Sequence, residues 1–439
     1  MRGPRPEQPG LRRDHRRLRG PGDDAVTQRL QDPLLAILVL GLLLRLAWAL
    51  LIPVEPVSDS AAYDTLARNI VEHGVFGFRP DEPSAYWAVG ASALAAATYT
   101  ILGDSYWGIV TLNIVAALVT AAFVERLGTR YFGRIAGLCA ACTIALWPNL
   151  ILFTTILSSE LYFILFTVAG LWFWSRGDET RWTDIVLAGV CWAAACYMRP
   201  IILLFPVALL ISAIPGGPRR FLRAGANCAV AMAVILALVA PWTYRNFQVF
   251  GEPVLMSTNF GANFWMGNNP ESEGDYMPLP AWTEGMGEVE RSDALLEQAK
   301  NHIRSEPGTF VRRTIEKALL MHSWESIGVA WNEPGITSRL GAAALLPLKL
   351  LLTGYWFVVL GLALAGFVML LSREGVRGLF HPVVAGWAYF TAIHAIVVAG
   401  DRYHMPSVPF MALLAGLALA QLATRPAVTR FRAFGGLSR

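Results

Sequence analysis

Long apolar stretches, separated by short polar segments, restrict most strongly what this chain can fold into. A helix needs about 20 apolar residues to cross the hydrocarbon core of a bilayer. Suitable stretches lie near residues 33–53, 105–125, 134–149, 151–174, 184–198, 200–214, 224–246, 345–371, 381–399 and 404–423. Because 55% of the 439 residues are hydrophobic and only 15% are charged, we expect an all-α polytopic membrane protein with about ten transmembrane helices.

Clusters of arginine set the expected orientation of these helices, since Lys and Arg concentrate in cytoplasmic loops and tails. The basic segments are residues 1–32, 126–134, 176–181, 219–223, 373–377 and 425–439. We therefore place both termini in the cytoplasm and expect a multi-pass protein of the plasma (inner) membrane. The active site is expected on the extracytoplasmic face, where three regions meet: residues 54–105, the turn at Arg199 and Pro200, and the loop 248–339.

One further apolar stretch, residues 85–102, tests this orientation. As a crossing it would reverse the side of every later loop and place the basic loop 126–134 outside. The stretch is rich in alanine and follows Asp81 and Glu82, which is typical of a helix that lies in the membrane interface. We expect this in-plane position, and a short true span is the alternative.

The apolar stretches and the basic segments divide the chain into five expected parts. They are a disordered basic cytoplasmic tail (1–32), an N-terminal transmembrane module (33–246) that includes the first outer loop (54–105), an extracytoplasmic loop region (247–340), C-terminal transmembrane helices (341–424) and a second basic tail (425–439). Within the loop region, the apolar periodicity of residues 292–303 predicts a short amphipathic helix.

Two acidic residues are candidates for catalysis. Asp59 follows the first crossing directly, at the boundary between lipid and water, where a partly desolvated carboxylate can act as a general base. An N-cap of the helical pattern that follows is the alternative for Asp59. Glu160 is the only charged residue between Gly137 and Trp174, and such an isolated group marks a functional site by default. A hydrogen bond to a neighbouring helix is its alternative.

Three arginines lie at the outer ends of crossings, against the positive-inside tendency. They are Arg199, Arg245 and Arg402. A guanidinium group matches the oxygens of a phosphate in bidentate geometry, so a phosphate-bearing ligand explains them. Snorkelling, or pairing with a local acid such as Asp401, is the alternative. Arg45 lies inside the first crossing and is expected to face the helix bundle.

Histidines near the last outer turn do not predict a metal centre. His394 and His404 have no third residue at ligand spacing. We therefore interpret them, from the pattern alone, as core or interfacial residues.

Seven short motifs in this order resemble those of one enzyme family. They are Asp59-Ser60-Ala61-Ala62-Tyr63, Tyr86-Trp87 to Gly90, Ala145-Leu146-Trp147-Pro148 with Ser159-Glu160, Tyr197-Met198-Arg199-Pro200, Pro241-Trp242-Thr243-Tyr244-Arg245-Asn246, Gly267-Asn268-Asn269-Pro270 and Arg402-Tyr403-His404-Met405-Pro406. Through them the chain resembles the C-type (GT-C) membrane glycosyltransferases, in the bacterial branch related to protein O-mannosyltransferases and aminoarabinose transferases. The resemblance extends from about Leu34 to Leu422.

The resemblance implies a GT-C-like fold with in-plane helices in the first outer loop. It also implies Asp59 as the catalytic base and Glu160 as a second catalytic acid, with a divalent cation (Mg or Mn) as a possible cofactor. The remaining motif residues are expected to bind substrate: Tyr63, Asn268, Tyr403 and His404.

The expected activity is transfer of a monosaccharide from a polyprenyl-phosphate donor to a cell-envelope acceptor, which is a lipid, glycan or protein hydroxyl. The sequence has no GxGxxG or GxxxxGK[ST] motif, and its candidate site faces away from the cytoplasm, where nucleotide sugars are made. A lipid-linked donor fits these facts, with its phosphate at Arg245, Arg402 or Arg199. Nucleic acid is not an expected partner. A transporter or lipid flippase, and a surface-polysaccharide polymerase or ligase, are the alternatives.

Overall fold

The computed structural model describes residues 21–176 and 181–424, and this part of the chain is almost entirely helical. Its β pairing is a single isolated bridge between Arg79 and Glu82. The longer helices are α1 (Pro21–Leu51), α2 (Asp59–His73), α3 (Gly90–Leu102), α4 (Trp107–Phe132), α5 (Arg134–Ala145), α7 (Glu160–Trp174), α8 (Trp182–Met198), α10 (Gly217–Phe250), α11 (Phe260–Asn268), α12 (Glu288–Ser305), α13 (Pro307–Leu320), α15 (Glu333–Leu340), α16 (Leu345–Glu374), α17 (Pro382–Ile396) and α18 (Val408–Thr424). The predicted amphipathic helix at 292–303 is part of α12.

Shorter helical turns join these elements. They are α6 (Pro148–Leu152), η1 (Phe153–Thr155), η3 (Pro200–Ile202), α9 (Phe205–Ala208), η4 (Leu209–Gly216), η5 (Ala281–Thr283), α14 (Ile327–Ala330), η6 (Ala342–Ala344), η7 (Gly375–Phe380) and η8 (Met405–Ser407). Part of the tail predicted as disordered is helical, because α1 already begins at Pro21. Extending an existing helix costs much less than nucleating a new one. Residues 1–20 and 425–439 of the predicted tails lie outside the described residues.

The apolar helices confirm a polytopic membrane protein. Five described segments are long and apolar enough to cross a bilayer: Pro33–Leu51, Trp107–Phe132, Pro200–Phe250, Ala342–Phe380 and Met405–Ala423. A sixth results if Arg134–Ala145 and Pro148–Thr155, which meet at an angle of 52°, form one broken span. Helices α7, α8 and α17 are apolar but shorter. Every predicted stretch contains helix, whereas the number of about ten crossings is not confirmed.

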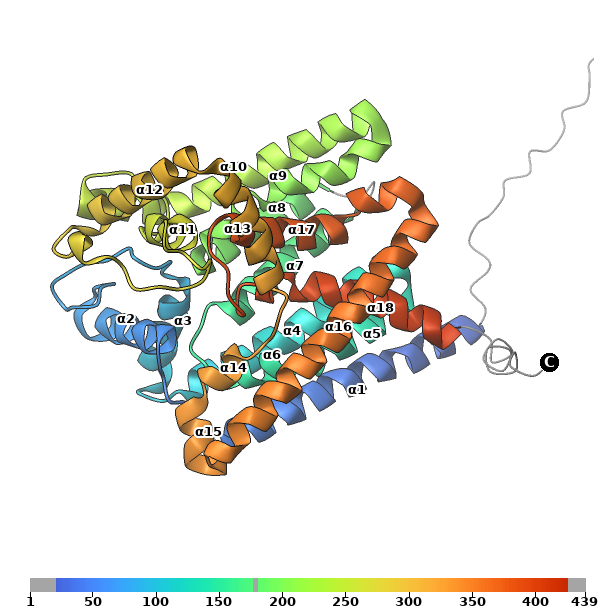
Figure 1. Ribbon diagram of the computed structural model, residues 1–439. Coiled ribbons are helices and arrows are strands. Elements are labelled where there is room, and N and C mark those ends of the chain that lie inside the picture. The colour runs from blue at the N-terminus through green and yellow to red at the C-terminus, as the bar shows by residue number, and fades with distance from the viewer. Residues whose placement is uncertain (1–20, 177–180, 425–439) are drawn as a thin grey trace, which may run out of the picture.

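Helix α3 occupies the apolar stretch on which the predicted orientation depends. Its 13 residues span about 20 Å at 1.5 Å per residue, which is less than the roughly 30 Å of a bilayer core. It packs on α2 through Tyr63, Ala67, Ala91 and Ala95, and the two helices lie together at one end of the molecule (Figure 1). The length of α3 favours the in-plane position.

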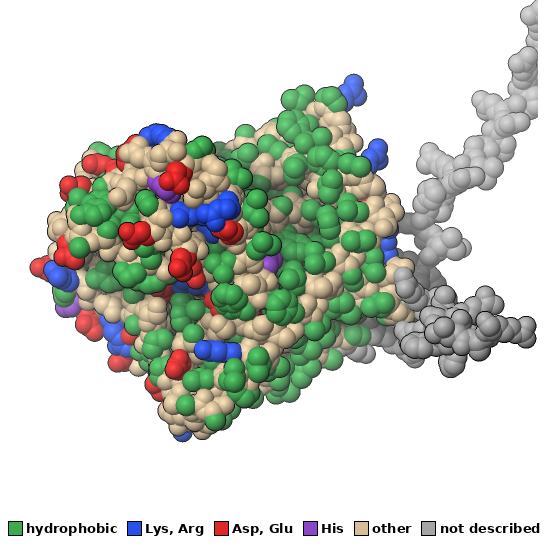
Figure 2. Space-filling view, viewed as in Figure 1, with side chains coloured by type: hydrophobic (Ala, Val, Ile, Leu, Met, Phe, Trp, Pro, Cys, Tyr) green, Lys and Arg blue, Asp and Glu red, His purple; other side chains and the backbone are tan. Residues whose placement is uncertain are grey.

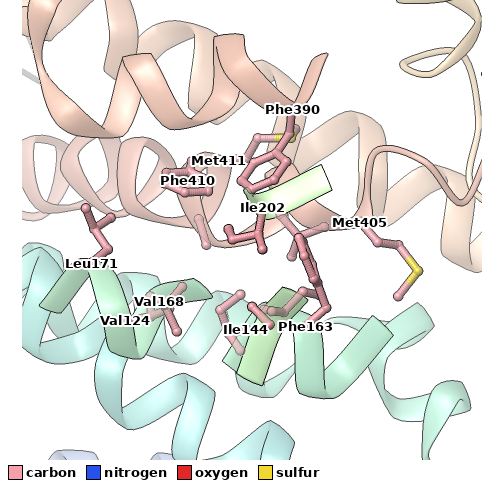
Figure 3. Packing of buried hydrophobic residues seen from close by; sticks show 14 of the residues in the cluster. Val124, Ile144, Phe163, Val168, Leu171, Ile202, Phe390, Met405, Phe410 and Met411 are labelled. Atoms are coloured by element: carbon pink, nitrogen blue, oxygen red, sulfur yellow. The ribbon is translucent and has the colours of Figure 1, made fainter. Parts of the chain in front are cut away.

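The helices pack around an apolar and aromatic core. Figure 3 shows side chains of α4, α5 and α7 gathered with those of α17 and α18 around Ile202. Phe205 stacks on Phe390 with ring centroids 5.3 Å apart. Helices α5 and α18 approach closely at Gly416, where an added Cβ would lie 2.4 Å from the Ala136 carbonyl oxygen. Small residues that allow such contacts are typical of helix pairs in membranes.

Charged side chains gather at one end of the molecule. Figure 2 shows the acidic and many of the basic side chains over the end that contains α2 and α12, while hydrophobic side chains cover much of the remaining visible surface. This distribution fits an apolar helical body within the bilayer and a polar outer region beyond it.

Candidate active site

Asp59 and Arg402 form an ion pair between segments 343 residues apart in the sequence. Asp59 is the first residue of α2, and the cap position belongs to Ser58, whose side chain makes no capping hydrogen bond. Arg402 lies over the rings of Trp331 and Tyr403, at 5.0 and 5.2 Å from their centroids. These rings hold the guanidinium group beside Asp59. Both charged side chains are about one quarter exposed, with values of 22% for Arg402 and 25% for Asp59.

Glu160 and Arg199 form a second ion pair. The predicted crossing 151–174 is broken, so that Glu160 begins α7 instead of lying within a span. The reason is local, since the polar run before Glu160 favours turns and a carboxylate is stabilised at a helix N-terminus. Arg199 also donates to Ser159 Oγ at 2.9 Å. Glu160 is 2% exposed, and its Oε2 has no hydrogen-bond partner in the described part of the chain.

A pocket of about 200 Å³ brings most of the candidate residues together. Its lining includes Asp59, Tyr63, Arg199, Arg402 and Tyr403. Most of its remaining lining side chains are apolar: Trp87, Ala88, Met198, Pro200, Ile201, Phe260, Ile393, Val397 and Val398. We call this cavity the apolar pocket.

Tyr63 links both ion pairs to the apolar pocket. Burial first, and then the negative charge of Glu160, raise the pKa of Tyr63 to about 12, and Asp59 acts in the same direction. Both carboxylates therefore lie within electrostatic reach of one phenol. Glu160 does not line the pocket itself, because Arg199 stands between them.

A second cavity, of about 260 Å³, also borders the first ion pair. It shares Asp59, Arg402 and Tyr403 with the apolar pocket. Its other lining residues are Ser58, Asp275, Tyr276, Ile327, Trp331, Gly400 and Asp401. Burial raises the pKa of the Asp275 carboxyl. We call this cavity the acidic pocket, and the Asp59–Arg402 pair borders both cavities.

Three residues predicted to bind ligand do not line either pocket. Arg245 donates to the Ser84 carbonyl at 2.8 Å and lies 4.8 Å above the Trp242 ring, so it ties α10 to the first outer loop. Asn268 Nδ2 donates to the backbone oxygens of Phe264, Ile396 and Val397. Each of these polar groups is used within the fold, and their predicted roles in binding stay predictions.

His404 is the third residue that lies outside both pockets. It is fully buried, and its ring nitrogens face the Met321 carbonyl and Glu325 Oε1, each at 2.9 Å. Glu325 also accepts hydrogen bonds from Trp147 Nε1 and Asn149 Nδ2. His404 therefore lies in the core, in agreement with the interpretation made from the pattern alone. Arg45 faces the bundle, as predicted, and donates to the Ala145 carbonyl at 2.8 Å.

The structure also brings to the pocket residues that the sequence did not single out as ligand contacts. Ser257, Asn259 and Asn263 come from the outer loop, and His394 comes from the last turn of α17. A sequence offers little signal for such residues, since polar side chains in a long loop are common. Only His394, a polar group in an apolar stretch, could have been noted by the reasoning applied to Glu160.

The donor set does not fit the possible divalent cation. Among residues 21–176 and 181–424, no group of three His, Cys, Asp or Glu residues could hold a metal ion. The carboxylates of Asp59 and Glu160 each pair with an arginine, whose positive charge opposes a cation at the same oxygens.

Comparison with known proteins supports the fold. A family model described as dolichyl-phosphate-mannose-protein mannosyltransferase matches residues 86–244. Among curated proteins no match is found. The apo structure of the Archaeoglobus fulgidus oligosaccharyltransferase superposes with a TM-score of 0.56 at 14% identity, over 91% of this chain and 52% of that chain. The same archaeal enzyme, in complex with an inhibitory peptide and a dolichol-phosphate, gives 0.54 at 15% identity, over 92% and 52%.

A third similar structure is ArnT from Cupriavidus metallidurans bound to undecaprenyl phosphate. It shows a TM-score of 0.44 at 14% identity, over 89% of this chain and 78% of that chain. This chain spans about half the length of the oligosaccharyltransferase. The family model and the archaeal structures confirm the predicted GT-C type at the level of the fold.

Proposed function

We propose that this protein, which has the fold of GT-C glycosyltransferases, transfers a monosaccharide from a polyprenyl-phosphate donor to a hydroxyl of a cell-envelope acceptor on the extracytoplasmic face. One observation supports the proposal: the Asp59–Arg402 pair borders two cavities of different character. A transferase needs such a place, because its base and its leaving-group stabiliser must face both substrates at once.

The apolar pocket suits a lipid-linked donor. Its apolar side chains can cover the first units of a polyprenyl chain, and Arg199 and Arg402 line the same cavity. Guanidinium groups bind phosphate oxygens in bidentate geometry. The archaeal oligosaccharyltransferase of similar fold has been described with a dolichol-phosphate, which supports a donor of this class.

The acidic pocket suits the acceptor. A hydroxyl that enters from this side reaches Asp59, which accepts its proton as the oxygen attacks the anomeric carbon. The new glycosidic C–O bond forms while the bond from the anomeric carbon to the phosphate oxygen breaks, and polyprenyl phosphate leaves with the bonding electrons. Arg402 stabilises the charge that develops on the phosphate. Its five N–H groups allow contact with Asp59 and phosphate together.

Glu160 acts through Arg199 in this proposal. It is almost fully buried and holds the guanidinium group that lines the apolar pocket. We therefore assign Glu160 a positioning role for the donor phosphate in place of direct acid catalysis.

The test is release of polyprenyl phosphate by the purified protein, supplied with polyprenyl-phosphate monosaccharides and a cell-envelope acceptor extract. Asp59→Asn removes the base and should lower the rate by roughly 100- to 10,000-fold. Asp104→Asn is the matched control, because Asp104 is also an outer carboxylate paired with an arginine but its side chain is 74% exposed and lines neither pocket. A rate for Asp59→Asn within a few-fold of the unmutated protein rejects the proposal. A flippase would release no polyprenyl phosphate.

A further inference from the structure

His394 carries a buried nitrogen that the fold leaves without a partner. The residue is 5% exposed and lines the apolar pocket. Its Nε2 has no hydrogen-bond partner among the described residues. Its ring packs against Tyr403, with centroids 4.8 Å apart. A buried polar atom without a partner costs about 1–3 kcal/mol, and such groups in native proteins require an explanation.

The buried His404 and the partly buried His322 do not share this feature. His404 has an acceptor at both ring nitrogens. His322 faces the Ala318 carbonyl with Nδ1 at 2.8 Å, and its Nε2 accepts from Trp387 Nε1 at 3.2 Å. Both residues serve the packing of the fold. His394 is the one of these three that lines the apolar pocket, and it is the one with a free nitrogen.

The chemistry of the ring restricts what this nitrogen can bind. A neutral imidazole has one donor and one acceptor nitrogen. With the ring proton on Nδ1, Nε2 is an acceptor. Its ligand must therefore present a donor. An ionised phosphate has only acceptor oxygens and a polyprenyl chain has no polar hydrogen, whereas a sugar ring offers hydroxyl groups.

We propose that His394 Nε2 accepts a hydrogen bond from a hydroxyl group of the donor sugar and so selects sugars that carry a free hydroxyl at that position. This inference rests on the proposed function, because it places a lipid-phosphate sugar in the apolar pocket. The location is suitable, since Tyr403 contacts both His394 and Arg402. The sugar would lie next to the group that holds its phosphate.

Binding measurements test the proposal separately from catalysis. Tryptophan fluorescence would report the affinity for bare undecaprenyl phosphate and for the same lipid carrying mannose, glucose, galactose or aminoarabinose. The unmutated protein should bind its preferred sugar lipid more tightly than the bare lipid. His394→Phe keeps an aromatic ring but loses the acceptor, so this preference should fall by roughly 10-fold, as expected for one hydrogen bond of about 1.4 kcal/mol. Affinity for the bare lipid should not change.

Two further variants complete the experiment. His394→Gln retains an acceptor oxygen and should recover most of the preference, while the matched control His73→Phe changes an exposed histidine at the end of α2, whose side chain is 41% exposed. Single-deoxy analogues of the preferred sugar should identify one position at which the unmutated protein discriminates and His394→Phe does not. An equal loss of affinity for sugar lipid and bare lipid, or an unchanged preference, overturns the proposal. Sugar-dependent binding without transfer would instead count against the proposed enzymatic function.

Discussion

Replacing Lys317 by methionine tests how one wall of the apolar pocket is held. Lys317 is 1% exposed, although it belongs to α13 in the outer loop region. Its Nζ donates at 3.1 to 3.3 Å to four oxygens, those of the Gly267, Ile396 and Val397 backbone and Asn268 Oδ1. Val397 lines the pocket. None of the four oxygens is a carboxylate, so the ammonium group is buried without a counter-ion.

The free-energy cost of burying the ammonium group follows from the pKa of Lys317. Burial, and then the charge of Arg313, lower it from 10.5 to about 8, which is worth about 3 kcal/mol at 1.36 kcal/mol per pKa unit. Between pH 8 and 10.5 the unfolded chain keeps a proton that the folded chain has lost. The free energy of unfolding therefore rises with pH in this window. From pH 7 to pH 10, the rise due to Lys317 is about 2 to 3 kcal/mol.

Thermal unfolding in one detergent, followed by tryptophan fluorescence at pH 7, 8, 9 and 10, measures this effect. Other groups also titrate, so the relevant quantity is the difference in pH dependence between the unmutated protein and Lys317→Met. The unmutated protein should gain thermal stability as the pH rises because of Lys317, and Lys317→Met should lack this gain. Lys300→Met, at a lysine whose side chain is 45% exposed, should keep it. The reasoning is refuted if Lys317→Met and the unmutated protein have parallel pH profiles.

Three further substitutions have distinct expected outcomes. Glu160→Gln weakens the hold on Arg199 and should lower kcat/KM for the lipid donor by roughly 10- to 100-fold, as for a charge-assisted hydrogen bond of about 1.5–3 kcal/mol; unchanged steady-state kinetics would contradict this role. Glu325→Ala removes the hydrogen-bond partner of the buried His404 ring, the Trp147 indole and the Asn149 amide, and should destabilise the protein by about 3–5 kcal/mol. An unaltered melting temperature would disprove this. Asp275→Asn should raise the KM for the acceptor a few-fold and leave the donor KM unchanged, because Asp275 lines only the acidic pocket; a change in the donor KM instead would show that the two pockets are assigned wrongly.

Features that depend on neighbouring residues along the chain could be predicted. Apolar stretches mark the helices of the body, and the amphipathic pattern at 292–303 marks α12. The composition of residues 85–102 predicts a helix beside the membrane, and the 13 residues of α3 are consistent with it. The break before Glu160 was not predicted, because an apolar count ignores the turn-forming Ser158 and Ser159.

The partner that a polar side chain binds depends on residues far away in sequence. Prediction from the sequence was therefore less successful for these partners than for the helices. Arg199, Arg245 and Arg402 look alike in sequence, since each follows or precedes an aromatic or proline residue at the end of an apolar stretch. In the fold, Arg199 and Arg402 line the apolar pocket, whereas Arg245 donates hydrogen bonds to two backbone carbonyls of the first outer loop. The partner that decides the outcome is far away in sequence in every case.

By itself, the sequence determined that this chain is a helical membrane protein and indicated a GT-C-like fold, with acidic and basic candidate residues near one end of its helices. The reason is that bilayer insertion depends on local hydrophobicity, which a sequence displays directly. Only the tertiary structure decided that Asp59 meets Arg402, that two cavities share this pair, and that His394 has a free nitrogen beside it. Such contacts join segments hundreds of residues apart, and their geometry arises from the packing of all the helices together.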